Sequence, residues 1–266
     1  MKISVITINY NNAEGLYHTI ESVISQTCDN FEFIIIDGGS TDYSIDVIRN
    51  SEDKIDYWVS EKDDGIYNAM NKGTNHAHGE YCIFMNSGDS FYNREVLEKI
   101  NTYNSDADVI VGKVAIDNND NIISPPPMSG KLTFYHLYSG AIPHQGAFIR
   151  TSLLRKYPYD ENLRIASDWK FFVQTMIFDD CSVRFVDEFI AQYNLNGISS
   201  TNSRLMREEK EMVLNDLFPQ RVLEDYRMMK AAECLTQKLT PKLRINYSID
   251  KILYRIGCFL LRFKRC

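Results

Sequence analysis

The chain has 266 residues, of which 44% are hydrophobic and 24% are charged, and its net charge at pH 7 is −7. This composition excludes a disordered chain and suits one large α/β domain, or one domain with an appendage. The charge is uneven, because eight Lys and Arg residues and one Asp give residues 238–266 a charge of +7, leaving −14 on residues 1–237. An acidic body without a basic stripe argues against nucleic acid as the main partner.

The six cysteines are scattered along the chain and form no CxxC pair and no metal-ligand spacing. We therefore expect reduced thiols in a cytoplasmic protein. Residues 1–7 lead directly into a strand pattern, without the apolar region or small-residue cleavage site of a signal peptide.

The first part of the chain alternates apolar runs with amphipathic helices. The pattern predicts strands at 2–8, 31–36 and 55–59, with helices near 14–24 and 44–49. A continuous apolar run at 80–85 predicts another buried strand. Strands that alternate with helices at this short period predict βαβ units and a mostly parallel sheet in an α/β fold.

Polar turns follow the first two predicted strands, at Asn9-Tyr10 and at residues 37–42. The carboxyl ends of parallel strands share one edge of the sheet, where open α/β sheets bind ligands. A carboxylate such as Asp37 could bind ribose hydroxyls, while small residues such as Gly39 let the backbone approach a nucleoside. The alternative is that these residues only form turns and helix caps. The sequence contains neither a GxGxxG fingerprint nor a GxxxxGK[ST] loop.

Two further segments could bind a diphosphate. Asp89 ends a Gly-containing turn after the strand at 80–85, and a carboxylate there could share a divalent cation with phosphates. The alternative is a cap for the helix predicted at 94–104. The helix that follows Asp64 could offer its N-terminal amides and Lys72 to phosphate oxygens, although Asp64 could also be only a cap.

These segments together resemble the family 2 glycosyltransferases, and most closely the bacterial branch that builds capsule, exopolysaccharide and O-antigen chains. The resemblance covers roughly residues 1–200 and rests on Asn9-Tyr10-Asn11, Ile36-Asp37-Gly38-Gly39-Ser40-Thr41-Asp42, Asp64-Gly65-Ile66-Tyr67-Asn68-Ala69-Met70-Asn71-Lys72-Gly73, and Gly79-Glu80-Tyr81 leading to Asn86-Ser87-Gly88-Asp89. It implies a GT-A fold, which is a Rossmann-like mixed, mostly parallel sheet flanked by helices. It also implies a nucleotide-sugar-binding half at 1–104, an acceptor-binding half at 105–200 and inverting transfer from a nucleotide sugar.

The resemblance implies a set of site residues. Those expected to contact the nucleotide sugar are Thr7, Asn9, Tyr10, Asp37, Gly39, Asp64, Lys72, Asn86, Ser87 and Asp89. Those expected near the acceptor or the sugar are His144, Gln145 and Trp169. Asp89 is the expected ligand of Mn²⁺ or Mg²⁺. The family usually has further acids in this turn, where this chain has Asn86 and Gly88, so strict metal dependence stays open.

Asp168 begins a segment with apolar residues at helical spacing, from Trp169 to Ile177. In the first turn of a buried helix its carboxylate could act only as a cap. The resemblance instead implies the general base, which takes the proton of the acceptor hydroxyl as that oxygen attacks the anomeric carbon. A bound metal would neutralise the leaving diphosphate, so the reaction needs no second carboxylate as acid.

Residues 201–266 are predicted to form a helical C-terminal extension, with helices near 205–217 and 222–239. The segment 245–266 is basic and amphipathic. Its apolar residues on one face are Ile249, Ile252, Leu253, Ile256, Leu260 and Phe263. Charges inside the segment argue against a transmembrane helix and favour an anionic membrane surface. Packing onto the domain or into a homodimer is an equal alternative.

These expectations define an inverting glycosyltransferase at the cytoplasmic face of a bacterial membrane. The favoured donor is a UDP-sugar, and the acceptor is a saccharide, expected to be lipid-linked. One rival is a sugar nucleotidyltransferase, although Asn9-Tyr10-Asn11-Asn12 lacks the Gly-rich loop with Arg and Lys of that class. The other is a non-catalytic carbohydrate-binding or scaffold protein on the same fold.

Overall fold

The computed structural model describes residues 2–103, 105–116, 121–123, 132–193 and 202–243. The chain forms two compact units, 1–213 and 214–266, and the division falls inside helix α9 (Ser203–Leu217). The second unit contains α10 (Gln220–Leu243), and the predicted membrane-surface segment 245–266 lies outside the described residues. The functional borders predicted at 104 and 200 stay predictions. Within the described ranges, no helix is long and apolar enough to cross a bilayer.

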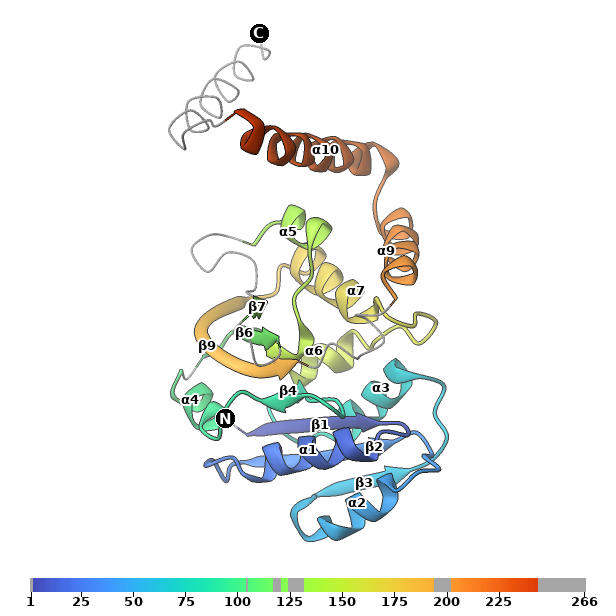
Figure 1. Ribbon diagram of the computed structural model, residues 1–266, viewed down its shortest axis with the longest axis vertical. Helices are drawn as coiled ribbons and strands as arrows, with labels where there is room; N and C mark the ends of the chain where they lie inside the picture. Colours follow the sequence, from blue (N-terminus) through green and yellow to red (C-terminus); the bar gives the residue numbers. More distant parts are fainter. Residues whose placement is uncertain (1, 104, 117–120, 124–131, 194–201, 244–266) are drawn as a thin grey trace. The chain divides into compact units, whose positions relative to one another are not determined.

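Four strands form the parallel half of the sheet in the first unit (Figure 1). They are β1 (Ile3–Asn9), β2 (Phe31–Asp37), β3 (Tyr57–Ser60) and β4 (Tyr81–Phe84), in the spatial order β3-β2-β1-β4. The connecting helices are α1 (Ala13–Ile24), α2 (Ser44–Asn50), the short 3-10 helix η1 (Glu52–Lys54) and α3 (Ile66–His76). All three strand pairs are parallel, which confirms the predicted βαβ units.

The rest of the sheet is mixed. Strand β8 (Ala147–Arg150) runs antiparallel to β4 and to β6 (Val109–Ile116), and β9 (Val183–Tyr193) runs parallel to β6. Two short strands, β5 (Ser90–Phe91) and β7 (Asn121–Ile123), pair with β9 and β6. Strand β9 is continuous over its 11 residues, and its register against β6 shifts around Lys113.

Short helices accompany this second half of the sheet. They are α4 (Val96–Thr102), α5 (Phe134–Ser139), the 3-10 turn η3 (His144–Gly146), α6 (Thr151–Lys156) and α7 (Ser167–Val173), which continues into the π-helical turn η4 (Gln174–Phe178). The turn η3 directly precedes β8, and α7 follows the loop after α6. The turn η3 lies against β4, and α7 is joined to α3 by the hydrogen bond between Tyr67 and Asp168.

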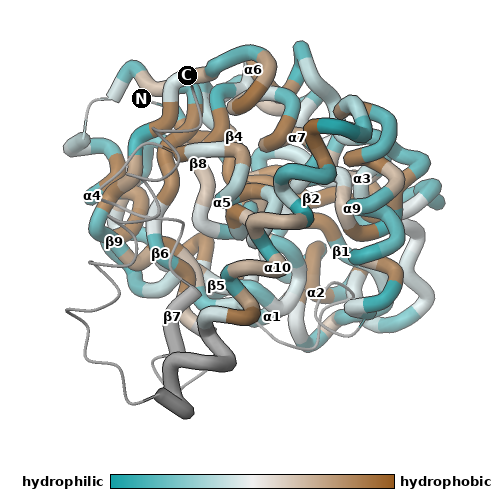
Figure 2. Tube along the Cα trace, turned by 90° about the horizontal axis from the view of Figure 1, so that it is seen from above, coloured by the Kyte–Doolittle hydropathy of each residue, from teal (hydrophilic) through white to brown (hydrophobic). Residues whose placement is uncertain are grey.

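Helices cover both faces of the parallel strands because successive side chains of a strand point to opposite faces. Ile3 and Val5 pack in one cluster with apolar residues of α1, α2 and α4. On the other face α3 packs so closely that a Cβ at Gly73 would lie 2.4 Å from Cγ2 of Ile6. Hydrophobic segments run through the interior, and more hydrophilic ones lie at the periphery (Figure 2).

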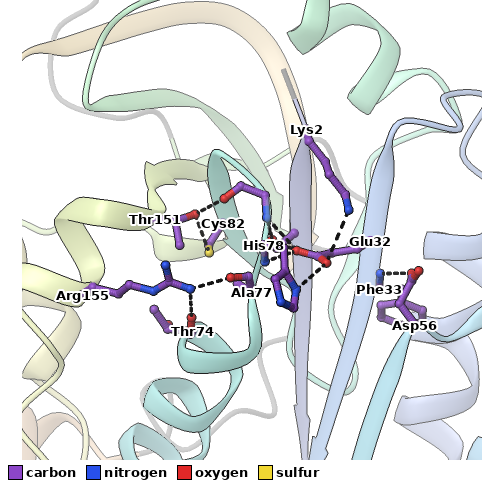
Figure 3. A network of polar contacts seen from close by, with 12 residues as sticks. Lys2, Glu32, Phe33, Asp56, Thr74, Ala77, His78, Cys82, Thr151 and Arg155 are labelled. Atoms are coloured by element: carbon purple, nitrogen blue, oxygen red, sulfur yellow. Dashed lines mark hydrogen bonds and ion pairs between the residues drawn. The ribbon is translucent and has the colours of Figure 1, made fainter.

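The turn between α3 and β4 is fixed by a buried carboxylate (Figure 3). Glu32 of β2 accepts hydrogen bonds from the Ser4 hydroxyl and from the backbone N–H groups of His78 and Gly79. Its second oxygen lies 3.7 Å from Lys2 Nζ. This network lies at the amino end of the parallel strands, so it leaves their carboxyl ends to the candidate site.

Candidate active site

The turn after β4 presents Asp89 at the carboxyl end of the sheet. Gly88 has φ +103°, a backbone conformation that favours glycine at this point of the turn. Thr19 of α1 is fully buried and holds this turn, because its Oγ1 lies 2.7 Å from the Asp89 carbonyl and accepts the Gly88 N–H. The Asp89 side chain is buried and accepts a hydrogen bond from Gln145 Nε2 at 3.2 Å.

Asp168 is the centre of a second cluster. It is the second residue of α7, and its carboxylate accepts a hydrogen bond from this first turn and also contacts side chains of α3 and η3. The Tyr67 hydroxyl donates to Oδ1 at 3.0 Å, and His144 Nδ1 lies 2.9 Å from Oδ2. The backbone N–H of Trp169 also donates to Oδ1. Three segments far apart in the sequence thus meet at one carboxylate.

Hydrogen bonds and neighbouring charges outweigh the effect of burial on the pKa of both Asp168 and His144. Burial would raise the pKa of Asp168, but the hydrogen bond and positive charge of His144, with help from the Trp169 N–H and the Tyr67 hydroxyl, outweigh it and lower that pKa. Burial would lower the pKa of His144, but the Asp168 hydrogen bond and the charges of Asp168 and Asp89 raise it. Burial and the Asp168 charge also raise the pKa of Tyr67, so its hydroxyl stays a hydrogen-bond donor.

Two adjacent residues of η3 connect the clusters. His144 contacts Asp168 through Nδ1, while its Nε2 lies 3.3 Å from Asn86 Nδ2. The next residue, Gln145, donates to Asp89. Five residues that the sequence singled out therefore lie together: Asn86, Asp89, His144, Gln145 and Asp168.

The turn offers oxygen ligands to a divalent cation. Asn86 Oδ1 is buried and has no hydrogen-bond partner among the described residues, and the Asp89 carboxylate belongs to the same turn. Mg²⁺ is commonly held by one or two carboxylates together with substrate phosphates, so these residues fit such an ion. Within the described ranges, no three His, Cys, Asp or Glu side chains are grouped as ligands.

The other part of the sheet edge is organised by Asp37, whose side chain is fully buried. Its carboxylate accepts hydrogen bonds from Asn9 Nδ2 at 2.8 Å and from the Ser40 and Ser60 hydroxyls, both at 2.6 Å. Burial would raise the pKa of Asp37, but these hydroxyls and nearby donors lower it. Asp37 thus ties together the ends of β1, β2 and β3, and its predicted contact with ribose or base stays a prediction.

The loop before α3 differs in detail from the sequence interpretation. Asp64 is exposed, whereas the neighbouring Asp63 is half-buried and its Oδ2 lies 2.4 Å from the position of a Cβ at Gly38. Lys72 is ion-paired with Glu61 at 2.6 Å. Asp63 is therefore the carboxylate of this loop that faces the turn after β2.

The remaining predicted residues vary in exposure. Tyr10 is 65% exposed beside this edge, and Gly39 has φ +79°. Ser87 accepts a hydrogen bond from Asn12 through its carbonyl. Thr7 and Trp169 are buried, with Thr7 Oγ1 donating to the Met85 carbonyl and Trp169 Nε1 to the Leu137 carbonyl. The side chains of Thr7 and Trp169 therefore support the site through backbone hydrogen bonds rather than lining its surface.

Sequence reasoning missed Tyr67 and Thr19 as members of the site. Tyr67 stands within the segment 64–73 that it singled out, and its place on the same face as buried apolar residues concealed its hydroxyl. Thr19 reads as an ordinary residue of α1, and no local signal distinguishes it. Only the three-dimensional structure brings it to the turn after β4.

The fold and this edge define the class of protein as a glycosyltransferase of the GT-A type. The chain belongs to the family described as Glycosyl transferase family 2, which matches residues 4–163. An uncharacterized glycosyltransferase of Mycobacterium tuberculosis is 31% identical over 210 residues, covering 74% of this chain and 77% of that protein.

Solved structures have the same fold. The Staphylococcus aureus TarS 1–349 structure in complex with UDP-GlcNAc has a TM-score of 0.66 at 18% identity, covering 85% of this chain and 70% of that one. Another TarS 1–349 structure is 21% identical with a TM-score of 0.63, and this chain spans only 60% of its length. The mannosyltransferase PcManGT of Pyrobaculum calidifontis, in complex with GDP-Man and Mn²⁺, has a TM-score of 0.55 at 18% identity and covers 72% of this chain and 56% of that one.

Proposed function

We propose that this glycosyltransferase moves a sugar from a nucleoside-diphosphate sugar, with UDP as the favoured nucleotide, to a hydroxyl of a saccharide acceptor, with inversion at the anomeric carbon. The observation that carries the proposal is the pair His144-Gln145. One residue contacts the candidate base Asp168, and the next contacts the candidate metal ligand Asp89. This arrangement suits a reaction that needs a base on one side of the anomeric carbon and a diphosphate on the other.

Asp168 is the group that receives the proton. In a single displacement the acceptor oxygen forms a bond to the anomeric carbon while the bond from that carbon to the diphosphate oxygen breaks. The hydroxyl proton passes to Asp168, and the nucleoside diphosphate leaves with the electron pair of the broken bond. The lowered pKa of Asp168 keeps its carboxylate ionised at neutral pH, and Tyr67 and His144 hold its orientation.

Asp89, with Asn86 Oδ1 from the same turn, would hold a divalent cation, Mn²⁺ or Mg²⁺. When bound, such an ion neutralises charge on the leaving diphosphate. Gln145 orients the Asp89 carboxylate through its hydrogen bond. Two solved structures of the same fold support this proposal, because one is in complex with UDP-GlcNAc and the other with GDP-Man and Mn²⁺.

The acceptor is proposed to be a lipid-linked saccharide of a surface polysaccharide pathway. The support is the charge of +7 on residues 238–266, which suits an anionic membrane surface. A relative from Mycobacterium bovis, 27% identical over 206 residues, is named a PGL/p-HBAD biosynthesis glycosyltransferase.

The test measures release of nucleoside diphosphate from a panel of UDP-, GDP- and dTDP-sugars with saccharide acceptors, for the wild type and Asp168→Asn. We expect one donor class to be used, with turnover by Asp168→Asn lower by roughly 10²- to 10⁴-fold because the proton acceptor is lost. Nuclear magnetic resonance of the product should show the opposite anomeric configuration to the donor. Equal turnover by the variant and the wild type would contradict the assignment of Asp168, and retention of configuration would contradict the single displacement.

A further inference from the structure

Helix α9 carries a buried carboxylate outside the segment matched by the family. Glu209 is 7% exposed, although its neighbour Glu208 lies on the solvent-exposed face of the same helix. A carboxylate is costly to bury unless its oxygens accept hydrogen bonds. The hydrogen-bond partners of Glu209 therefore indicate which part of the chain it stabilises.

Those partners are three consecutive backbone N–H groups. Glu209 accepts hydrogen bonds from Arg164, Ile165 and Ala166 at 2.8, 3.0 and 3.0 Å. Ala166 is the cap residue of α7, and Asp168 stands two positions further along. Hydrogen bonds to a charged acceptor are short and strong, so Glu209 fixes the backbone that leads into Asp168.

The next residue of α9 contacts the other side of the same cluster. Lys210 Nζ donates to the Gly140 carbonyl at 2.9 Å and lies 4.7 Å from the centre of the Trp169 ring. Trp169 follows Asp168, and Gly140 stands four residues before His144. One turn of α9 thus contacts both segments that carry the Asp168–His144 pair.

We infer that Glu209 is a positioning residue for Asp168, acting through the backbone of residues 164–166. The inference rests on the proposed function, in which Asp168 is the base. Displacement of a reacting group by about 1 Å can cost as much as 100-fold in rate, so a carboxylate that fixes the entry to α7 affects the chemical step. We expect it to leave donor binding unchanged, because its partners are backbone groups before α7 and are not among the residues proposed to bind the donor.

The test compares Glu209→Gln with Glu208→Gln, a matched change on the exposed face of the same helix. We expect kcat of Glu209→Gln to fall roughly 10- to 100-fold, with the Kd of the nucleotide unchanged within about twofold. Glu208→Gln should behave as the wild type. Glu209→Asp keeps the charge, so it should recover part of the lost turnover, and it replaces Glu209→Gln if that variant does not fold.

A double-mutant cycle separates positioning from general destabilisation. In the Asp168→Asn background, Glu209→Gln should cause no further loss of the remaining turnover, because the group that it positions is already gone. A further loss equal to that in the wild-type background would overturn the inference. Wild-type turnover by Glu209→Gln would overturn it as well.

Hydrogen exchange gives a readout that needs no activity. The amides of residues 164–166 should exchange faster in Glu209→Gln than in the wild type or Glu208→Gln, and unchanged exchange would overturn the inference. If the wild type transfers no sugar from any donor, the proposed function fails. Faster exchange would then still show that Glu209 holds this backbone, so the two failures can be distinguished.

Discussion

Asp168 has a structural role in α7 and, in the proposed mechanism, a chemical role as well. Its carboxylate accepts the Trp169 N–H in the first turn of α7, as a capping group would, and it also contacts Tyr67 and His144. A carboxylate with two directed side-chain donors from different elements is typical of an oriented functional group. The orientation, rather than the residue type, distinguishes Asp168 from an ordinary buried acid.

Removal of His144 should change both turnover and its pH dependence. In the proposed mechanism activity requires ionised Asp168, so turnover should be lost as the pH falls through the pKa of that residue. Because His144 lowers this pKa, His144→Gln should raise it and move the acid limb of the kcat profile to higher pH. We also expect kcat at pH 7 to fall about tenfold, consistent with the loss of one charge-assisted hydrogen bond.

Tyr67→Phe is the matched comparison, since it removes a neutral donor from the same carboxylate. The acid limb of the kcat profile of Tyr67→Phe should also move to higher pH, by a smaller amount than that of His144→Gln. The measurement is kcat against pH for the three proteins with saturating donor. An acid limb that does not move in His144→Gln would show that the His144–Asp168 contact plays no part in the reaction.

At the scale of elements, the sequence predicted the parallel half of the sheet well and the mixed half less well. Runs such as Phe31–Ile36 are long, apolar and bounded by turn residues, so their periodicity is decisive. Strand β8 has four residues, and its place between β4 and β6 depends on partners distant in the sequence. The sequence indicated Asp168 and His144 but not Glu209. The inferred role of Glu209 depends on a contact between α9 and the loop before α7, which are distant in the sequence.

The Glu32 network makes a prediction about stability. The lowered pKa of Glu32 results from the Ser4, His78 and Gly79 hydrogen bonds and the Lys2 charge, which together outweigh the effect of burial. A lowered folded-state pKa stabilises the protein above the unfolded value of 4.5, and this contribution is lost as the pH falls through the folded value. Glu32→Gln should therefore lower the free energy of unfolding at pH 7 by about 2 kcal/mol.

The measurement is urea denaturation of Glu32→Gln and the wild type at pH 7 and at several values below 4.5. The difference between the two proteins should shrink as the pH falls. Glu21→Gln, at an exposed position of α1, is the control. Its free energy of unfolding should differ little from that of the wild type at the highest and the lowest pH. A difference for Glu32→Gln that stays constant with pH would mean that its charge contributes nothing to stability.

At the scale of the whole molecule, the acidic body and the basic tail have separate roles in the proposal. The body contains the site, and the tail is expected to meet a membrane surface. The full-length protein should sediment with vesicles that contain anionic lipid and not with neutral vesicles, and added salt should weaken binding. A variant with Glu in place of Lys251, Arg255 and Arg262 should lose this binding without losing turnover on a water-soluble acceptor. Equal binding to neutral and anionic vesicles would contradict the electrostatic part of the proposal.

The central claim is that the carboxyl edge of the sheet binds a nucleoside diphosphate against Asp89 while Asp168 serves the chemistry. Calorimetric titration of UDP, GDP and dTDP, each with and without Mn²⁺, tests it directly on the wild type, Asp89→Asn and Asp168→Asn. We predict that one nucleotide binds the wild type, that Mn²⁺ strengthens its binding, that Asp89→Asn removes the effect of Mn²⁺, and that Asp168→Asn binds as the wild type does. Failure of all three nucleotides to bind the wild type, with or without Mn²⁺, would contradict the account.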